Sequence, residues 1–337
     1  MSPGARLAAV LGVLALVLLL VAAAALFVGS AALSPGAVLA ALTGRTGARS
    51  IESVVTLSIR LPRIAVAALA GGALAVAGVA FQALTRNPLA EPSVLGVSGG
   101  AAFGVVIGQS VGLGFGVLGA AGLTAFAFAG AVVAAGAVYL VAGAGRLSVQ
   151  TLLLAGVIVG LFFASAITVV ISFVDVNRLG GVIHWLLGNL ATIPPASLGL
   201  FALTAAAGLA LVLPHARELN LLALGEEAAQ QLGVAAERLK LQIFAGAALL
   251  TASVVAFAGP IGFVGLIVPH ALRLLLGPDN RLLVPAAFVG GGIFLLAADT
   301  VARSIVAPAE LSVGVITSFC GAPFFVWLLR TRYRALL

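Results

Sequence analysis

Apolar runs of about the length that crosses a bilayer dominate this sequence. We identify ten of them, at residues 7–28, 61–84, 93–112, 115–143, 151–173, 197–213, 242–258, 261–276, 282–302 and 311–330. Hydrophobic residues make up 62% of the 337 residues and charged residues 8%, which is too little polar surface to cover a soluble globule. The pattern therefore predicts an all-α polytopic membrane protein with about ten transmembrane helices. The two shortest runs are compatible with re-entrant or tilted segments, and we interpret 7–28 as a retained span and not a signal peptide, since it is long for a signal core.

Basic residues divide unequally between the two sides of the membrane if the N-terminus is cytoplasmic. Eleven then lie inside and six outside, which agrees with the positive-inside rule. The six outer residues are Arg45, Arg49, Arg60, Arg63, Arg178 and Arg303. This many outer arginines predict an acidic partner on that side. The net charge of +7 comes without the basic cluster and interleaved aromatic residues of nucleic-acid binders, so we interpret it as topology and contact with anionic membrane lipid.

The stretch 214–240 is the longest polar interruption on the inner side. Gly225 and Gly233 divide it into two short helical pieces, each with an apolar side. The stretch also carries the adjacent glutamates Glu226 and Glu227. An amphipathic helix could lie on the membrane surface, but anionic lipid repels paired glutamates, which favours a protein partner.

Two further polar interruptions contain prolines. Arg86–Pro92 carries two prolines between apolar runs and predicts non-helical turns. The second, 259–273, carries Gly259, Pro260, Gly262, Gly265 and Pro269. Irregular backbone at membrane depth is tolerated only against protein or a watery cavity. Within 259–273, His270 and Arg273 are equally compatible with a contact to a cytoplasmic partner and with structural hydrogen bonds. Further along the chain, the i,i+4 spacing of Asp299 and Arg303 permits an ion pair.

At the predicted outer face, the fifth run is followed by a turn and a short helix at 179–190 that ends before Pro194 and Pro195. Trp185 suits an interfacial anchor, and His184 beside it is more typical of an interfacial residue than of a ligand. A competing interpretation is that this segment lines the mouth of a pathway. The candidate mouth residues are Asp175, Asn177, Arg178, His184 and Trp185.

Several classes of chemistry are disfavoured. The phosphate-binding motif G-x-x-x-x-G-K-[ST] is absent and Lys240 is the only lysine, so ATP must be bound by another chain. We find no cluster with metal-ligand spacing and expect neither a bound metal nor a cofactor. Cys320, the single cysteine, excludes a disulfide within a monomer. An intramembrane enzyme is the alternative class, but its candidate groups, such as Asp175, Asp299 and the histidines, are dispersed over loops and span ends.

The sequence resembles the FecCD-type permeases of ABC importers for iron chelates and cobalamin. The matching text is RLPR at 60–63, GGALAVAGVAFQALTRNPLAEPSVLGVSGGAAFG at 71–104, LLLAG at 152–156, WLLGNL at 185–190, LGEEAAQQLGV at 224–234, GPIGFVGLIVPHALR at 259–273, ADTVAR at 298–303 and ELSVGVITSFCGAPFFVWLL at 310–329. The family pattern has proline where Ser312 stands, and commonly small hydroxyl residues where Val149 and Gln150 stand. The second departure concerns the inner gate.

This resemblance implies a permease subunit that is not itself an enzyme. Two copies enclose a pathway, two cytoplasmic ATPase subunits drive it, and a binding protein delivers substrate from outside. Arg60, Arg63 and Arg303 match docking residues for that binding protein. The segment 215–238 matches the ATPase-coupling helices, with Leu224, Gly225, Glu226, Glu227, Ala228, Leu232 and Gly233 in contact. The inner gate matches Asn87, Pro88, Leu89, Ser148, Val149 and Gln150.

Together these features predict a single transmembrane permease domain over 1–337, in the bacterial cytoplasmic (inner) membrane. Within the family, haem, ferric siderophores and cobalamin are all carried. We favour an iron chelate, haem or siderophore, as substrate, with cobalamin as the alternative.

Overall fold

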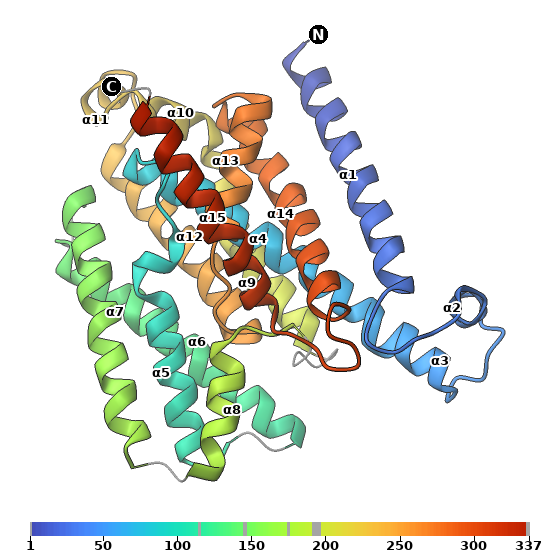
Figure 1. Cartoon of the computed structure of the whole chain (residues 1–337). Coiled ribbons are helices and arrows are strands. Elements are labelled where there is room, and N and C mark those ends of the chain that lie inside the picture. Colours follow the sequence, from blue (N-terminus) through green and yellow to red (C-terminus); the bar gives the residue numbers. More distant parts are fainter. Residues whose placement is uncertain (1, 114–115, 144–146, 174–175, 191–196, 335–337) are drawn as a thin grey trace.

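The computed structural model describes residues 2–113, 116–143, 147–173, 176–190 and 197–334, apart from the side chains of a few residues within these ranges. These ranges form helices, turns and loops and contain no strand. Figure 1 shows most of the helices gathered into one bundle, with α1 along its edge. The predicted all-α membrane fold is therefore confirmed.

Ten apolar helices account for the predicted spans within the described ranges. Seven candidate spans are long and apolar enough to cross a membrane. They include α1 (Pro3–Phe27), α4 (Leu61–Thr85), α6 (Gly116–Val141), α7 (Val149–Ile171), α9 (Leu198–Val212), α12 (Ala236–Ala258) and α14 (Asn280–Ala302). Three shorter ones are α5 (Val97–Ser110), α13 (Val264–Leu276) and the apolar part of α15 (Val313–Arg334).

The lengths of two spans differ from the sequence prediction. The predicted run at 93–112 contains a separate 3-10 helix, η2 (Pro92–Leu95), so α5 has only 14 residues. Conversely, α12 begins at Ala236 and not at 242; its first two turns carry Glu237, Arg238 and Lys240, so hydropathy assigns them to the polar segment. Hydropathy alone misplaces both boundaries, because it does not record where a helix breaks or begins.

Helix α4 is the centre of the bundle and packs against α14, α12 and α13. Glycines allow this close approach: a Cβ at Gly71 would lie 2.1 Å from the carbonyl oxygen of Gly291, and one at Gly291 would lie 2.2 Å from that of Gly71. Glycines of α5 allow the same approach to α6, where a Cβ at Gly104 would lie 2.0 Å from the Phe126 oxygen. Small residues at such contacts are typical of packed membrane helices.

Short elements lie at the two ends of the bundle. One end holds α10 (Ala216–Ala223), α11 (Glu226–Gln231) and the turn η4 (Leu213–His215), together with the start of α1 and the end of α15 (Figure 1). The opposite end holds α2 (Pro35–Leu42), α3 (Ile51–Ser53), the π-helix η1 (Val54–Arg60) and α8 (Val176–Leu186) (Figure 1). We call these the α10 end and the α8 end; they correspond to the predicted inner and outer sides.

Candidate functional site

The α10 end carries the predicted coupling segment, which is folded as two short helices. Gly225 (φ 120°) and Gly233 (φ 86°) occupy the left-handed region and flank α11, as their spacing predicts. The α10 helix is anchored, because Leu219 and Leu222 are buried and Asn220 is hydrogen-bonded to the turn before α14. The segment is therefore a fixed platform on the bundle.

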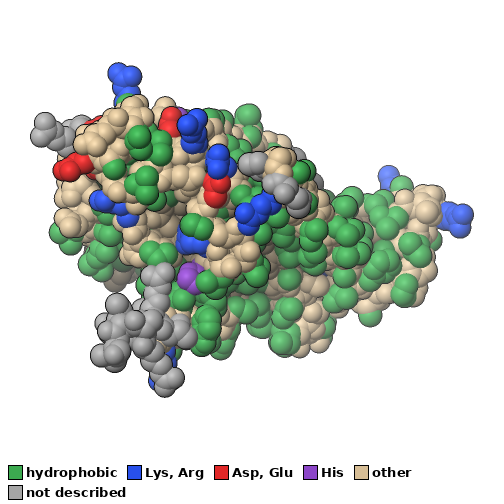
Figure 2. All heavy atoms as spheres, turned by 90° about the horizontal axis from the view of Figure 1, so that it is seen from above, with side chains coloured by type: hydrophobic (Ala, Val, Ile, Leu, Met, Phe, Trp, Pro, Cys, Tyr) green, Lys and Arg blue, Asp and Glu red, His purple; other side chains and the backbone are tan. Residues whose placement is uncertain are grey.

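An exposed patch on this platform combines apolar and acidic side chains. Leu224 is 70% exposed and Leu232 59% exposed, and Glu227 is exposed beside them. Figure 2 looks onto this end of the molecule and shows acidic and basic side chains together on it. Glu226 differs from Glu227, because its carboxylate accepts a hydrogen bond from the buried Lys240 at 2.9 Å. Within the predicted coupling set, Leu224, Glu227, Leu232 and Gly233 are thus exposed, whereas Gly225, Glu226 and Ala228 are half-buried.

The break after α4 forms one half of the predicted inner gate. Arg86 adopts the left-handed conformation (φ 50°) and ends α4. Asn87 then closes a turn, since its side-chain oxygen accepts from the Leu89 amide at 3.0 Å across Pro88. Asn87 is exposed, whereas Pro88 and Leu89 are half-buried. The turn lies beside the coupling segment: the Arg86 guanidinium comes within 4.0 Å of the position of a Cβ on Gly225.

The other half of the predicted gate is the start of α7. Ser148 is the N-cap residue of α7, and Val149 and Gln150 belong to its first turn. Both Ser148 and Gln150 are exposed. Further along, α7 packs on the broken segment after α4, because a Cβ at Gly156 would lie 2.2 Å from the Val94 oxygen. The structure thus joins α7 to the segment that includes η2, while the gating role itself stays a prediction.

Glu91 links two broken segments that are far apart in the sequence. Its carboxylate accepts a hydrogen bond from the amide of Phe263, which has a left-handed φ of 67° and caps α13. Gln82 makes a second link, since it donates to the Gly265 oxygen at 3.1 Å and accepts from Arg273 at 2.9 Å. Of the two interpretations of Arg273, the structure supports the structural hydrogen bond. Sequence analysis missed Gln82, and at Glu91 it predicted a non-helical turn but not the bond to Phe263.

At the α8 end, the predicted docking arginines are buried and not exposed. Arg60 is 3% exposed, Arg63 7% and Arg303 3%. Arg63 forms a bidentate ion pair with Asp299, with distances of 2.9–3.1 Å, and a second pair with Glu310 at 2.7 Å. Asp299 and Arg303 are 3.7 Å apart, so the predicted i,i+4 pair is secondary to the one with Arg63.

The other two arginines of this cluster hold the end of α1. Arg60 donates to the carbonyl oxygens of Leu26 and Ala31, and Arg303 donates to that of Ala25. The last carbonyls of a helix lack intrahelical donors and carry partial negative charge, so they attract guanidinium groups. These three arginines thus have acceptors within the chain itself, and their role in docking stays a prediction. Arg45 and Arg49, in the loop between α2 and α3, are exposed.

The predicted mouth is only partly described. Helix α8 spans Val176–Leu186, so the predicted helix at 179–190 begins three residues earlier and ends before Gly188, whose left-handed φ of 70° breaks it. Asp175 lies outside the described residues, and Asn177 and Arg178 belong to the first turn of α8. His184 is exposed and Trp185 is partly buried against the core. The end of this segment is tied to α12, because the Asn189 amide donates to the Ala258 oxygen at 2.8 Å.

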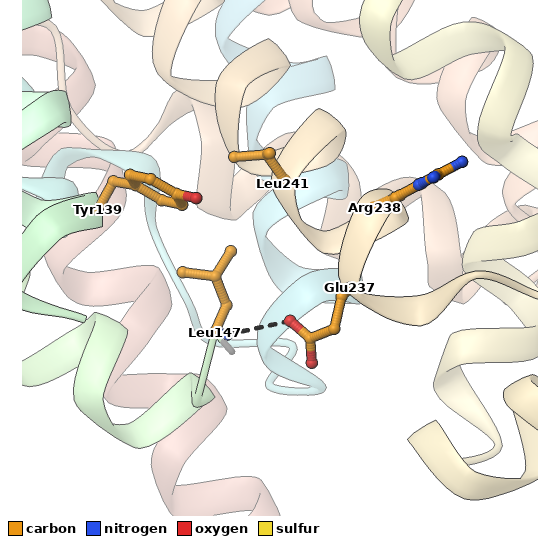
Figure 3. Close-up of a pocket in the computed structure, with 5 residues that line it drawn as sticks. All are labelled: Tyr139, Leu147, Glu237, Arg238 and Leu241. Atoms are coloured by element: carbon orange, nitrogen blue, oxygen red, sulfur yellow. Dashed lines mark hydrogen bonds between the residues drawn. The ribbon is translucent and has the colours of Figure 1, made fainter. Parts of the chain in front are cut away.

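Among the described residues, no three His, Cys, Asp or Glu side chains are grouped so that they could hold a metal ion. A cavity of about 130 Å³ lies at the α10 end and is lined by Tyr139, Leu147, Glu237, Arg238 and Leu241. Figure 3 shows Leu147 and Glu237 joined by a hydrogen bond, with Tyr139 and Leu241 facing them and Arg238 pointing away.

Comparison with known proteins places the chain in one family. The model of the FecCD transport family matches residues 15–331. The cobalamin import system permease protein of Halobacterium salinarum is 44% identical over 290 residues, covering 85% of this chain and 76% of the relative. The hemin transport system permease protein of Yersinia pestis is 38% identical over 278 residues, covering 82% and 83%. The ferric enterobactin transport system permease protein of Escherichia coli K12 is 37% identical over 333 residues, covering 98% and 97%.

A solved structure agrees over nearly the whole chain. It is described as an inward-facing conformation of a metal-chelate type ABC transporter, and it matches with a TM-score of 0.82 and 31% identity, covering 96% of this chain and 99% of the other. Fold, span content and sequence thus agree. This chain belongs to the FecCD transport family.

Proposed function

We propose that this chain is the permease subunit of an ATP-driven importer that brings an iron chelate, haem or a ferric siderophore, into the cytoplasm. The observation that carries this proposal is the exposed apolar and acidic patch of α11, held on an anchored platform in a member of a transport family. Such a patch suits a protein partner, because exposed leucines beside a carboxylate favour burial against a complementary surface.

The partner at the α10 end is proposed to be a cytoplasmic ATPase subunit. The chain lacks a phosphate-binding loop motif, and its only lysine is buried and bonded to glutamates. The energy source must then bind to another chain. Two permease copies would be paired with two such subunits, in the bacterial cytoplasmic (inner) membrane.

A second copy of the chain is proposed to complete the pathway. Helix α7 presents a row of large apolar side chains to the outside of the isolated chain, among them Leu154, Ile158, Leu161 and Phe162. Each is at least half exposed. A homodimer in which the α7 helices face each other would place this helix along the central pathway, with the mouth near α8 and the gate at 87–89 and 148–150.

A substrate-binding protein is proposed to dock at the α8 end. Support comes from the charge balance there, since the three arginines of the cluster face two carboxylates, Asp299 and Glu310, and leave one positive charge in excess. For docking through these arginines, a carboxylate of the binding protein must compete with Asp299 or Glu310 for the guanidinium groups. Glu310 is the nearest to solvent, with 30% of its side chain exposed.

The proposed ATPase contact predicts a strong effect of substitutions in α11 and just before it. Replacing Leu224 with aspartate and Glu227 with lysine is expected to prevent copurification of the ATPase and to abolish uptake. The first change removes an apolar side chain from the exposed patch, and the second reverses its charge. Pull-down of the ATPase from detergent-solubilised membranes and uptake in vesicles measure this. Charge reversal of the exposed Arg49 at the opposite end, Arg49→Glu, is the matched control for ATPase binding. Normal copurification and uptake in the α11 variant would refute the coupling assignment.

The substrate can be identified by the compound that the cognate binding protein binds, and uptake of that compound then tests the proposal. We expect that protein to copurify with, or tightly bind, haem or a ferric siderophore, and that the reconstituted complex accumulates the same compound when ATP is supplied. Cobalamin is the second candidate, favoured by the 44% identity to the archaeal cobalamin permease. Binding and uptake of cobalamin without iron-chelate uptake would replace the first proposal by the second.

A further inference from the structure

Lys240 is the only lysine in the chain and is buried in an unusual setting. It lies in the second turn of α12, and only 3% of it is exposed. Its ammonium group binds three oxygens: Glu237 at 2.7 Å, the Leu147 carbonyl at 2.8 Å and Glu226 at 2.9 Å. A buried ammonium has three protons to satisfy, and all three have acceptors here. This side chain is therefore held in one position.

Each of the three acceptors belongs to a different segment of the chain. Glu226 is the first residue of α11, Glu237 lies on α12 itself, and Leu147 directly precedes the N-cap of α7. Glu237 also accepts a hydrogen bond from the Leu147 amide at 3.1 Å (Figure 3). The peptide groups of Leu147 are thus bound on both sides, by the lysine and by the glutamate. We call Leu147, Glu226, Glu237 and Lys240 the lysine node.

The lysine node lies beside an open pocket. The cavity of about 130 Å³ lies against Leu147 and Glu237, so the start of α7 is not enclosed by packed side chains on that side. Charge-assisted hydrogen bonds among partly desolvated groups are stronger and more directional than apolar contacts. A displacement of α11 would therefore move Leu147 through Lys240, because these hydrogen bonds deform less than the surrounding apolar contacts.

We propose that Lys240 is a positioning residue that couples α11 to the first turn of α7, so that movement of the ATPase-facing helix sets the position of Ser148–Gln150. This rests on the proposed function, which supplies the ATPase contact on α11 and the pathway role of α7. The alternative is that the node only stabilises the fold. The two differ in one respect: a coupling residue affects how hydrolysis is used, whereas a stabilising residue affects how much folded complex is present.

The test compares Lys240→Met with Lys240→Arg in the complex of permease, ATPase and cognate binding protein reconstituted in proteoliposomes. Spin labels on Gln150→Cys in both copies, in a Cys320→Ser background, report the distance between the two α7 helices with and without ATP and vanadate. We expect Lys240→Met to assemble and hydrolyse ATP, but to lose the nucleotide-dependent distance change and to transport about tenfold fewer substrate molecules per ATP. Lys240→Arg, which keeps the charge, should restore much of the coupling.

Glu226→Gln provides a second variant that weakens the link to α11 without changing its shape. If both residues act through one contact, the effects of Lys240→Met and Glu226→Gln on coupling will not add. Arg281→Met is the matched control, because it removes a cation from an ion pair at the same end that is exposed and outside the node. If Lys240→Met does not assemble, Glu226→Gln decides the question alone. A normal ratio of transport to hydrolysis and a normal distance change in whichever variant assembles would overturn the proposal.

Failure of the inference can be separated from failure of the proposed function. If the wild-type complex shows ATP-driven uptake and the α11 patch is needed for ATPase binding, but the node variants couple normally, only the inference is wrong. If the wild-type complex neither binds an ATPase through α11 nor changes its α7 distance with nucleotide, the proposed function itself is wrong.

Discussion

Replacing Asp299 with asparagine is expected to destabilise the folded permease by about 3–5 kcal/mol, because it leaves buried arginines without their main counter-charge. Asp299 is 1% exposed and is bonded by Arg63 through two nitrogens, with Arg303 3.7 Å away. Asparagine keeps the shape of the side chain but removes its charge. The change is measured as the shift in free energy of unfolding during denaturant titration of the purified protein in detergent.

The control for this prediction is Arg281→Met, which breaks the ion pair between Arg281 and Asp279. Both side chains of that pair are largely solvent-exposed, so water replaces the lost contact and little change is expected. An unfolding curve of Asp299→Asn that coincides with the wild type would contradict the structural role of the cluster. For the same reason, simultaneous reversal of Arg60, Arg63 and Arg303 to glutamate would unfold the region around the end of α1, and could not report binding-protein docking alone.

Single cysteines in the proposed gate are expected to crosslink between two copies of the chain. In a Cys320→Ser background, Leu89→Cys and Gln150→Cys should each react with the same position in the second copy when short bifunctional reagents are added to the inward-closed complex. Gln150 is exposed at the start of α7, and Leu89 follows the turn that ends α4, so both are at the α10 end where the pathway is proposed to close. Crosslinked dimers are counted on denaturing gels.

The nucleotide state provides the control for this experiment. Crosslinking should fall when the ATPases are trapped in a state that opens the α10 end. A cysteine at Gly4, near the start of α1, serves as the positional control, since a side chain there would meet no neighbouring atom within 4 Å. If neither gate position crosslinks in any nucleotide state of an active complex, the pathway does not run between the α7 helices and the gate assignment is wrong.

The sequence by itself determined the local features of this protein. Hydropathy identified the apolar helices, because a span through lipid must bury about 20 consecutive residues whatever it packs against. Gly225 and Gly233 marked the limits of α11, because glycine adopts positive φ angles at less cost than residues with a Cβ. Each of these depends on residues close together in the chain.

Which polar groups meet depends on how the helices pack. Arg63 and Asp299 are 236 residues apart, Glu91 and Phe263 are 172 apart, and Lys240 and Leu147 are 93 apart. A helical period shows which side of a helix a residue occupies, but the helix facing that side depends on the packing of the whole bundle. For this reason three of the six arginines that were predicted to lie outside, Arg60, Arg63 and Arg303, are held by internal carboxylates and by the end of α1. For the same reason, a lysine that was notable in the sequence for being alone joins α11, α12 and α7 in the structure.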